Sequence, residues 1–255
     1  MKLSISRIKA FKSCRRMFQL KYVENLEPIQ KAEALETGSN YHSLLEELNK
    51  TGNFESDYSK ESAMVTAYKK YIYPHFKVTE AEKYVEYDLG DGDTLIGFVD
   101  GVTDNGYIVE HKTTGMDITE QYEYNLLWDE QILAYMLMTG MRKVWYTVCR
   151  KPTIRIKKNE SEEEFFERMV AWYDEDTDSK IRLLEIERTD EEVEQFRQDL
   201  EVIKATIQEA VQDKNFYKNT CHCNMYGRRC EYSSICLNYQ PNAEYIDFYR
   251  KEEQA

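Results

Sequence analysis

Three residues near the middle of the chain have the types and spacing that bind a divalent metal ion and act on phosphate. Asp100 ends the segment LIGFVD, and Glu110 and Lys112 lie two apart in YIVEHKTT. In a strand, this spacing puts Glu110 and Lys112 on one face and His111 on the other. Two carboxylates suit Mg²⁺ or Mn²⁺, and the amine could position water or stabilise charge on a phosphate. An exposed Glu–Lys pair beside a turn-capping Asp is the structural alternative.

Two helical segments carry further polar residues in patterns that fit the same chemistry. His42 follows Gly38 by four residues, and Gln131 precedes Tyr135 by four, so each pair shares one helix face. Gln131 and Tyr135 could therefore reach one site together. A surface or core histidine, and an ordinary helix flank, are the alternatives for these positions.

The elements that must position these residues begin with a meander. Residues 84–89, 94–102 and 107–113 are rich in β-branched and aromatic side chains, and Gly-Asp-Gly and Asp-Asn-Gly turns separate them. Helical spacing predicts helices over residues 6–23, 32–50, 60–74, 119–140, 160–173 and 189–213. Further strands are expected at 143–150, which is apolar enough to be internal, at 153–157 and at 183–188. This order predicts an α/β protein, a mixed sheet with helices on both sides.

Composition limits the class of protein. The chain has 255 residues, 42% of them hydrophobic and 13% aromatic, which excludes a disordered chain. No apolar run approaches the roughly 18 residues of a membrane helix, and the N-terminal segment lacks a secretory apolar core. We therefore expect a soluble, cytoplasmic protein that does not contact a membrane.

The net charge of −13 speaks against nucleic acid as a partner, but the charge is unevenly distributed. Residues 1–31 carry a net +6 and residues 142–158 a net +7, whereas 32–141 carry −14 and 159–213 carry −13. Because screening confines fields to roughly 8–10 Å, the two basic blocks could line a phosphate-binding surface. Chance clustering on solvated faces is the alternative.

Four of the six cysteines lie in the sixteen residues CHCNMYGRRCEYSSIC, at Cys221, Cys223, Cys230 and Cys236. In a reducing compartment such a cluster favours metal over disulfides, and thiolates select zinc or iron–sulfur clusters. The spacings do not match paired Cys-x₂-Cys zinc knuckles. Cys149 lies in a predicted core strand and is read as a buried free thiol.

Taken together, these motifs resemble the PD-(D/E)XK nuclease superfamily, in the branch of RecB-type exonucleases, AddB and the CRISPR-adaptation nucleases. The resemblance spans about residues 4–240. Its motifs read Ser6…Cys14, Gly38-Ser-Asn-Tyr-His42, Gly97-Phe-Val-Asp100, Glu110-His-Lys112 and Gln131-Ile-Leu-Ala-Tyr135. The proline that the family name places before the aspartate is Val99 here, as often in this branch.

The resemblance implies a site and a cofactor set. His42, Asp100, Glu110 and the main-chain carbonyl of His111 would bind Mg²⁺ or Mn²⁺. Lys112 would be the catalytic lysine, and Gln131 and Tyr135 would orient substrate. A [4Fe–4S] cluster would join the chain ends through one N-terminal and three C-terminal cysteines, assigned as Cys14, Cys223, Cys230 and Cys236. Cys221 competes with Cys223, which is preferred for its position relative to Tyr226-Gly227, and zinc at the same ligands is the alternative.

The resulting expectation is a single nuclease domain over residues 1–255, with 1–31 and 214–240 forming an iron–sulfur subdomain. The cluster would bring together a basic, DNA-binding corner made of Lys12, Arg15, Arg16, Arg228 and Arg229. The predicted activity is metal-dependent hydrolysis of DNA, as an exonuclease acting on ends or single strands in recombination, repair or processing. With no nucleotide-binding Gly-x-x-x-x-Gly-Lys-Ser/Thr motif, unwinding would need a helicase or recombination partner.

Two other classes compete with this reading. A non-catalytic DNA-binding or assembly module could keep the fold and cluster, but it would be expected to lack an acidic ligand, and none is missing. A zinc-stabilised interaction domain of unrelated fold would require the ordered motif series to be coincidence.

Overall fold

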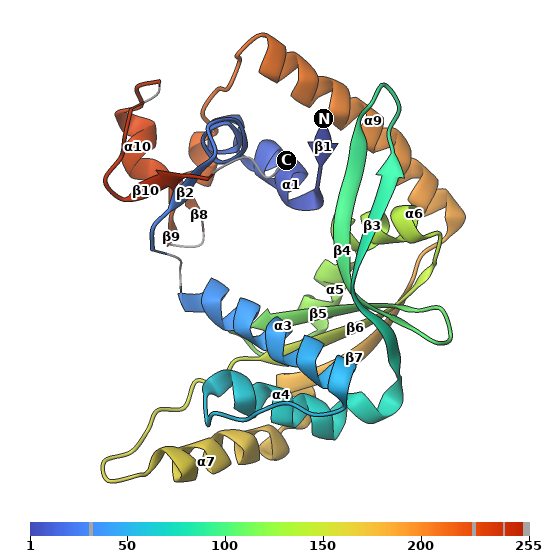
Figure 1. The fold of residues 1–255 in the computed structure, drawn as a ribbon, viewed down its shortest axis with the longest axis vertical. Coiled ribbons are helices and arrows are strands. Elements are labelled where there is room, and N and C mark those ends of the chain that lie inside the picture. The colour runs from blue at the N-terminus through green and yellow to red at the C-terminus, as the bar shows by residue number, and fades with distance from the viewer. Residues whose placement is uncertain (31–32, 226–227, 242, 252–255) are drawn as a thin grey trace. The chain divides into compact units, whose positions relative to one another are not determined.

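A mixed β-sheet carries the predicted meander and confirms the α/β class (Figure 1). The computed structural model describes residues 1–30, 33–225, 228–241 and 243–251. The strand order is β1-β4-β5-β6-β7, and β3 pairs with β4. Its strands are β1 (Lys2–Leu3), β3 (Val78–Asp88), β4 (Thr94–Thr103), β5 (Ile108–Thr114), β6 (Lys143–Arg150) and β7 (Ile181–Glu187).

The chain divides into two compact units. The first unit contains residues 33–87 and 96–196, and the second unit contains 1–32, 88–95 and 197–255. The single-domain organisation expected from the sequence stays a prediction.

In the first unit, β6 is internal, as its apolar sequence predicts. It pairs in parallel with β5, from Ile108↔Val144 to Thr114↔Arg150, and antiparallel with β7. The β4–β5 ladder is antiparallel, with Gly101 opposite Val109. Asp100 comes directly before this ladder, and its Oδ2 accepts a 2.6 Å hydrogen bond from the His111 N–H, so Asp100 lies next to the Glu110 segment, as the meander predicts.

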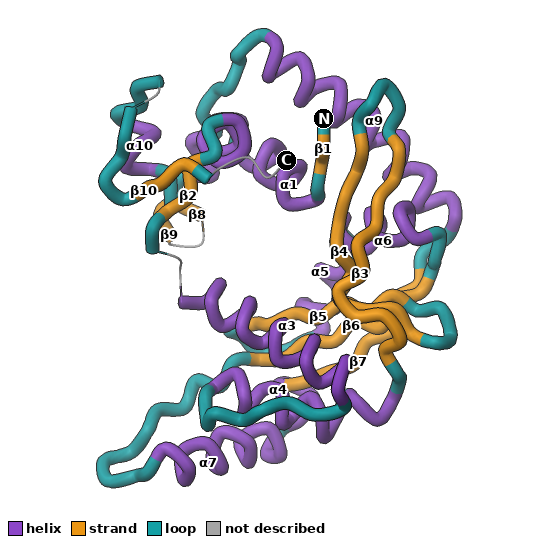
Figure 2. The backbone as a smooth tube through the Cα atoms, viewed as in Figure 1, coloured by secondary structure: helices purple, strands orange, loops and turns teal. Residues whose placement is uncertain are grey.

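Helices cover both faces of this sheet (Figures 1 and 2). Side chains alternate along β6, so that Val144, Tyr146 and Val148 pack in one core and Cys149 packs in the other. The first core includes side chains of α5 (Glu120–Leu126) and α6 (Glu130–Thr139), and the second includes side chains of α3 (Glu33–Thr51), α4 (Lys60–Tyr71) and α7 (Glu162–Glu175). The short helix α8 (Thr177–Lys180) leads into β7, and a 3₁₀ turn, η2 (Tyr73–His75), precedes β3.

Two predicted elements of the first unit differ from the structure. The helix expected over 119–140 is split, because Asp129 caps a new helix by accepting a 3.1 Å hydrogen bond from the Gln131 N–H. The strand expected at 153–157 is irregular. It follows Pro152 directly, and the β5–β6 ladder ends at Thr114↔Arg150, beyond which the Lys151 N–H donates a 2.8 Å hydrogen bond to the Thr114 carbonyl.

The second unit packs residues from the N-terminal and C-terminal segments of the chain around a small core of Leu20, Leu26, Tyr232, Ile235 and Phe248. The long predicted N-terminal helix is interrupted at Cys14, whose extended backbone (φ −162°) ends one helix before the next begins. The remaining elements are α1 (Ile5–Ser13), α2 (Arg15–Phe18), the π-turn η1 (Gln19–Val23), β2 (Leu26–Pro28), η3 (Thr220–His222), β8 (Asn224–Met225), β9 (Arg228–Arg229), α10 (Ser233–Leu237) and β10 (Phe248–Arg250).

Two strand pairings join N-terminal and C-terminal segments to the rest of this unit. Strand β10 pairs antiparallel with β2, and β1 pairs in parallel with the first residues of β4. The helix α9 (Asp190–Gln212) also contributes, because Lys204 donates a 2.6 Å hydrogen bond to the Leu89 carbonyl. No helix among the described residues is long and apolar enough to cross a membrane.

Candidate active site

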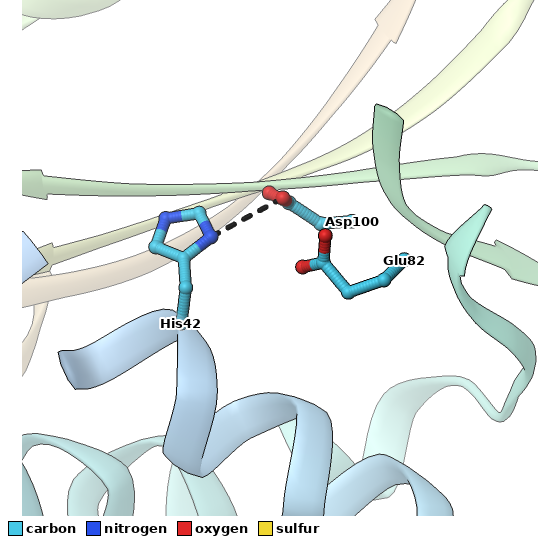
Figure 3. Close-up of side chains that lie close together, drawn as sticks. All are labelled: His42, Glu82 and Asp100. Carbon is cyan, nitrogen blue, oxygen red and sulfur yellow. Dashed lines mark hydrogen bonds and ion pairs between the residues drawn. The ribbon is translucent and has the colours of Figure 1, made fainter. Parts of the chain in front are cut away.

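Three side chains from three elements converge at one point of the first unit (Figure 3). They are His42 from α3, Glu82 from β3 and Asp100 from β4, and one ligand atom of each lies within 4.8 Å of the other two. The His42 Nδ1 is 3.2 Å from the Asp100 Oδ1. An imidazole and two carboxylates at this spacing form a donor set that suits a hard divalent ion.

The backbone holds each of these residues differently. His42 lies within the helix α3, and the Asp100 Oδ2 accepts a 2.6 Å hydrogen bond from the His111 N–H. Glu82 has a φ of 49°, in the left-handed region, although it lies within β3. Such a conformation costs a non-glycine residue about 1–2 kcal/mol, so the surrounding structure must impose it.

A second group of side chains forms a hydrogen-bonded chain next to this set. Lys112 donates to Glu110 and, at 3.0 Å, to the Gln131 Oε1, and the Gln131 Nε2 donates to the Tyr135 hydroxyl at 2.8 Å. Glu110 is 2% exposed, and its Oε2 is buried without a partner. A buried carboxylate oxygen with no partner is costly, which is what a site that receives a cation would leave.

The charges of the site perturb its titration. Burial raises the pKa of Glu110 well above its ordinary value, and the Asp100 charge raises it further. Burial also acts to raise the pKa of Asp100, but the contacts with His42 and the His111 N–H outweigh it and lower this pKa. Burial and the Asp100 charge raise the pKa of Glu82. The carboxylates therefore repel one another, and a cation between them would relieve that repulsion.

Close packing behind β4 positions the lysine network. A Cβ added at Gly97 would lie 3.0 Å from the Met138 Cε and 3.1 Å from the Tyr135 Cε1. The absence of a side chain at Gly97 thus lets Tyr135 pack against the strand, where it is 7% exposed. Tyr135 accepts a hydrogen bond from Gln131, and Gln131 accepts one from Lys112, so the tyrosine helps to position the lysine through the glutamine. Orientation of substrate by Gln131 and Tyr135 stays a prediction.

The predicted residues are brought together, and the structure adds one. His42 and Asp100 are in contact, and Glu110, Lys112, Gln131 and Tyr135 form the adjoining network. The His111 side chain points into the core that includes side chains of α3, α4 and α7, where its Nδ1 lies 2.7 Å from the Thr147 Oγ1. Ligation of a metal ion by the His111 main-chain carbonyl stays a prediction. Sequence reasoning missed Glu82, because its side chain direction depends on a backbone conformation that the strand pattern does not reveal.

The second unit places the four assigned cysteines around one cavity of about 240 Å³. The lining includes Cys14, Cys223, Cys230 and Cys236. The Asn219 N–H donates to the Cys14 Sγ at 3.4 Å, and the Cys230 N–H donates to the Cys223 carbonyl at 3.0 Å. Burial raises the pKa of the Cys230 thiol, and Cys223 and Cys14 raise it further. Cys221 is exposed and is not part of this lining.

The expected basic corner lies in the same unit. Arg16 and Arg229 also line the cysteine cavity. The Arg16 guanidinium donates to the Gln19 Oε1 at 2.6 Å, and the Arg15 guanidinium lies between the Phe11 and Tyr217 rings. The Arg228 side chain and Tyr226-Gly227, on which the preference for Cys223 rests, lie outside the described residues. Phosphate binding by Lys12 and these arginines stays a prediction. Cys149 is buried, as expected for a core thiol.

Comparison with known proteins places these features in a family. Residues 2–73 and 55–237 match the model of the PD-(D/E)XK nuclease superfamily. The fold is similar to that of a protein from Eubacterium rectale provisionally described as an exonuclease. The TM-score is 0.56 and the identity 13%, over 96% of this chain and 90% of that one. A phage-related exonuclease from Haemophilus somnus matches with a TM-score of 0.45 and 12% identity, over 84% and 97% of the two chains. No curated protein sequence matches this chain.

Proposed function

Since the chain belongs to the PD-(D/E)XK nuclease superfamily, we propose that it is a metal-dependent deoxyribonuclease that acts on DNA ends or single strands. The observation that carries the proposal is the convergence of His42, Glu82 and Asp100 next to the Glu110–Lys112 pair. The proposed role is in recombination, repair or processing of DNA, with any unwinding supplied by a helicase or recombination partner.

The donor set fits Mg²⁺ or Mn²⁺. Carboxylate oxygens and one imidazole are available, and the unpartnered Oε2 of Glu110 is a further buried donor. We assign His42, Glu82, Asp100 and Glu110 as ligands, with the His111 carbonyl as a candidate fifth. When bound, such an ion neutralises phosphate charge and makes water more acidic.

The chain's own residues supply the rest of the chemistry. Lys112 is fixed by Glu110 and Gln131, yet 30% of its side chain is exposed, so its ammonium can donate to a water or a phosphate oxygen. Held in that position, it orients the attacking water or stabilises the charge that develops on the phosphate. Gln131 fixes the lysine geometry, and Tyr135 fixes Gln131.

A cleavage assay tests the activity. Labelled single- and double-stranded DNA, linear and circular, is incubated with Mg²⁺ or Mn²⁺ and with the wild type or Lys112→Ala. We expect loss of at least a hundredfold in rate with DNA binding retained, because one preorganised charged donor contributes about that much. Lys70→Ala, which removes an exposed lysine on α4 that pairs with Asp174, is the matched control and should cleave normally.

Two outcomes would contradict the proposal. Unchanged cleavage by Lys112→Ala would remove the site assignment. A wild-type protein that binds DNA but cleaves none of these substrates with either metal would instead favour the non-catalytic binding module.

We further propose that Cys14, Cys223, Cys230 and Cys236 bind a [4Fe–4S] cluster. The four thiols line one cavity, and their spacing supports a cluster over a single zinc ion. Tetrahedral zinc, with Zn–S bonds of about 2.3 Å, would hold its sulfurs within about 4 Å of one another. Among the described residues, no three cysteine sulfurs lie within 4.8 Å of one another. The Asn219 N–H bond to the Cys14 sulfur is of the kind that tunes iron–sulfur centres.

Metal analysis after anaerobic purification tests the cluster. Iron and acid-labile sulfide should approach four of each per chain, and Cys230→Ser should lose both. Cys221→Ser is the control that also separates the two competing ligands, since it should retain the cluster while Cys223→Ser loses it. Stoichiometric zinc without iron would overturn the assignment.

A further inference from the structure

The aromatic side chain of Phe98 lines the same pocket as the metal-binding set of His42, Glu82 and Asp100. A cavity of about 680 Å³ in the first unit is lined by His42, Glu82 and Asp100 and also by Phe98, Leu35 and Lys151. Its size is within the range of pockets that hold small organic ligands. Because the metal-binding set forms part of its lining, a nucleotide whose phosphate lies at that set would lie beside Phe98, Leu35 and Lys151.

Phe98 is placed by the geometry of its strand. It lies two residues before Asp100 in β4, so both side chains point to the same face, and it is 56% exposed. Two strand residues span about 7 Å, which is comparable to the distance from the phosphate of a nucleotide to its base. A phosphate at the metal-binding set would therefore have its base within reach of Phe98.

One neighbouring ring contacts Phe98, and more than half of the Phe98 residue stays exposed. Tyr84, on the neighbouring strand β3, packs against Phe98 with the ring centroids 5.3 Å apart at 63°. This cross-strand contact contributes to the hairpin, by about 0.2–1 kcal/mol. The contact with Tyr84 does not account for the exposure of Phe98 in the pocket that the metal-binding residues line. Nor does it account for Leu35, which lines the same pocket and is 61% exposed.

We propose that Phe98 stacks on the base attached to the scissile phosphate, and that the enzyme therefore acts on unpaired nucleotides. In a duplex each base covers the faces of its neighbours and presents only its edges in the grooves. An aromatic ring can use the face of a base only where the strand is single or frayed. Leu35 contributes an apolar wall, and Lys151 contributes a cation for an adjacent phosphate. This inference rests on the proposed nuclease function and narrows the scissile nucleotide to an unpaired one, in a single strand or at a frayed end.

The first test is cleavage of single-stranded oligonucleotides with Mn²⁺. One substrate is intact and the other carries an abasic tetrahydrofuran residue at the scissile position. Wild type should cleave the abasic substrate at least fivefold more slowly in kcat/KM, the lower limit for one base–aromatic stack. Phe98→Ala should cleave both at that lower rate, and Phe98→Tyr should recover the preference because it restores a ring. Trp128→Ala removes an aromatic residue 72% exposed outside this pocket and should behave as wild type.

The second test does not depend on cleavage. An oligonucleotide with terminal 2-aminopurine is bound in the presence of Ca²⁺, and its fluorescence should be quenched by wild type but not by Phe98→Ala. Cleavage whose abasic preference survives in Phe98→Ala, with quenching also retained, would overturn the stacking role and leave the nuclease function intact. Quenching that requires Phe98 in a protein that cleaves nothing would support stacking and contradict the nuclease function.

Discussion

At the scale of single residues, Glu82 combines a strained backbone with an unfavourable charge environment. Its φ of 49° and its proximity to Asp100 both cost free energy in the absence of a cation. Residues that keep such costs cluster at functional sites. A strand pattern alone does not single out Glu82 among the acidic residues of β3, so only the folded backbone identifies it.

Replacing Glu82 by glutamine should separate metal binding from stability. Glu82→Gln keeps the size of the side chain but removes one ligand charge, so Mn²⁺ affinity should fall about tenfold or more. Without metal the variant should be slightly more stable, by less than about 1 kcal/mol, because the repulsion at this half-exposed position is screened. Calorimetric titration and thermal unfolding measure the two effects. Glu80→Gln, an exposed β3 carboxylate paired with Lys83, should change neither.

The buried Glu110 carboxyl should make metal binding depend on pH. Burial raises its pKa in the folded protein above the ordinary value of 4.5, so the metal-free folded state holds a proton that the unfolded chain releases. Metal-free stability therefore falls as pH rises from 4.5 through the folded-state pKa. A metal must displace that proton, and its stabilising effect should grow over the same range. Melting temperatures with and without Mn²⁺, at about pH 6 and about pH 8, test this. A Mn²⁺-induced shift that is equal at both values would contradict it.

At the scale of elements, the meander and β6 could be predicted because local signals agree there. Gly-Asp-Gly and Asp-Asn-Gly turns bracket alternating strands, and the apolar run of residues 143–150 marks an internal strand. The predictions that failed concern segments where one local signal competes with another, or where a strand pattern has no partner strand. Apolar periodicity continued through residues 127–129, but the Asp129 cap began a new helix there. Residues 153–157 read as a strand, yet they have no ladder to join.

The contact between β4 and α6 should be sensitive to a single methyl group. Gly97→Ala is compatible with the backbone, but its Cβ would press on the Tyr135 ring and on the flexible end of Met138. Overpacking of this kind costs about 1–3 kcal/mol. Because Tyr135 holds Gln131 and thereby Lys112, kcat should fall with KM little changed.

The matched control for this variant is Gly115→Ala. A Cβ at Gly115 would meet nothing within 4 Å, and its φ is not in the left-handed region. That variant should be neutral or slightly stabilising, by a few tenths of a kcal/mol. Equal losses of activity in the two variants would show that packing behind β4 does not position the lysine.

At the scale of the whole molecule, the net charge of −13 has to be compared with the local charge that a DNA strand would encounter. Part of the acidic excess is the site itself, since Glu82 and Asp100 belong to the metal-binding set and Glu110 to the adjoining lysine network. Another part lies on exposed turns of helices such as the start of α7, with Glu162, Glu163 and Glu164. Acidic side chains of these two kinds do not exclude a basic surface elsewhere, because their fields are screened over about 8–10 Å.

The salt dependence of DNA binding should therefore report a few local contacts rather than the net charge. For a single strand, the slope of log K against log salt is about −0.7 for each phosphate neutralised. Lys12→Ala and Arg229→Ala should each make the slope less negative by about 0.7 if each side chain neutralises one phosphate. Lys158→Ala tests the second basic block in the same way, and Lys70→Ala on α4 should leave the slope unchanged. Binding measured in the Lys112→Ala background avoids cleavage. Slopes that stay equal in all four variants would place the phosphate track away from both basic blocks.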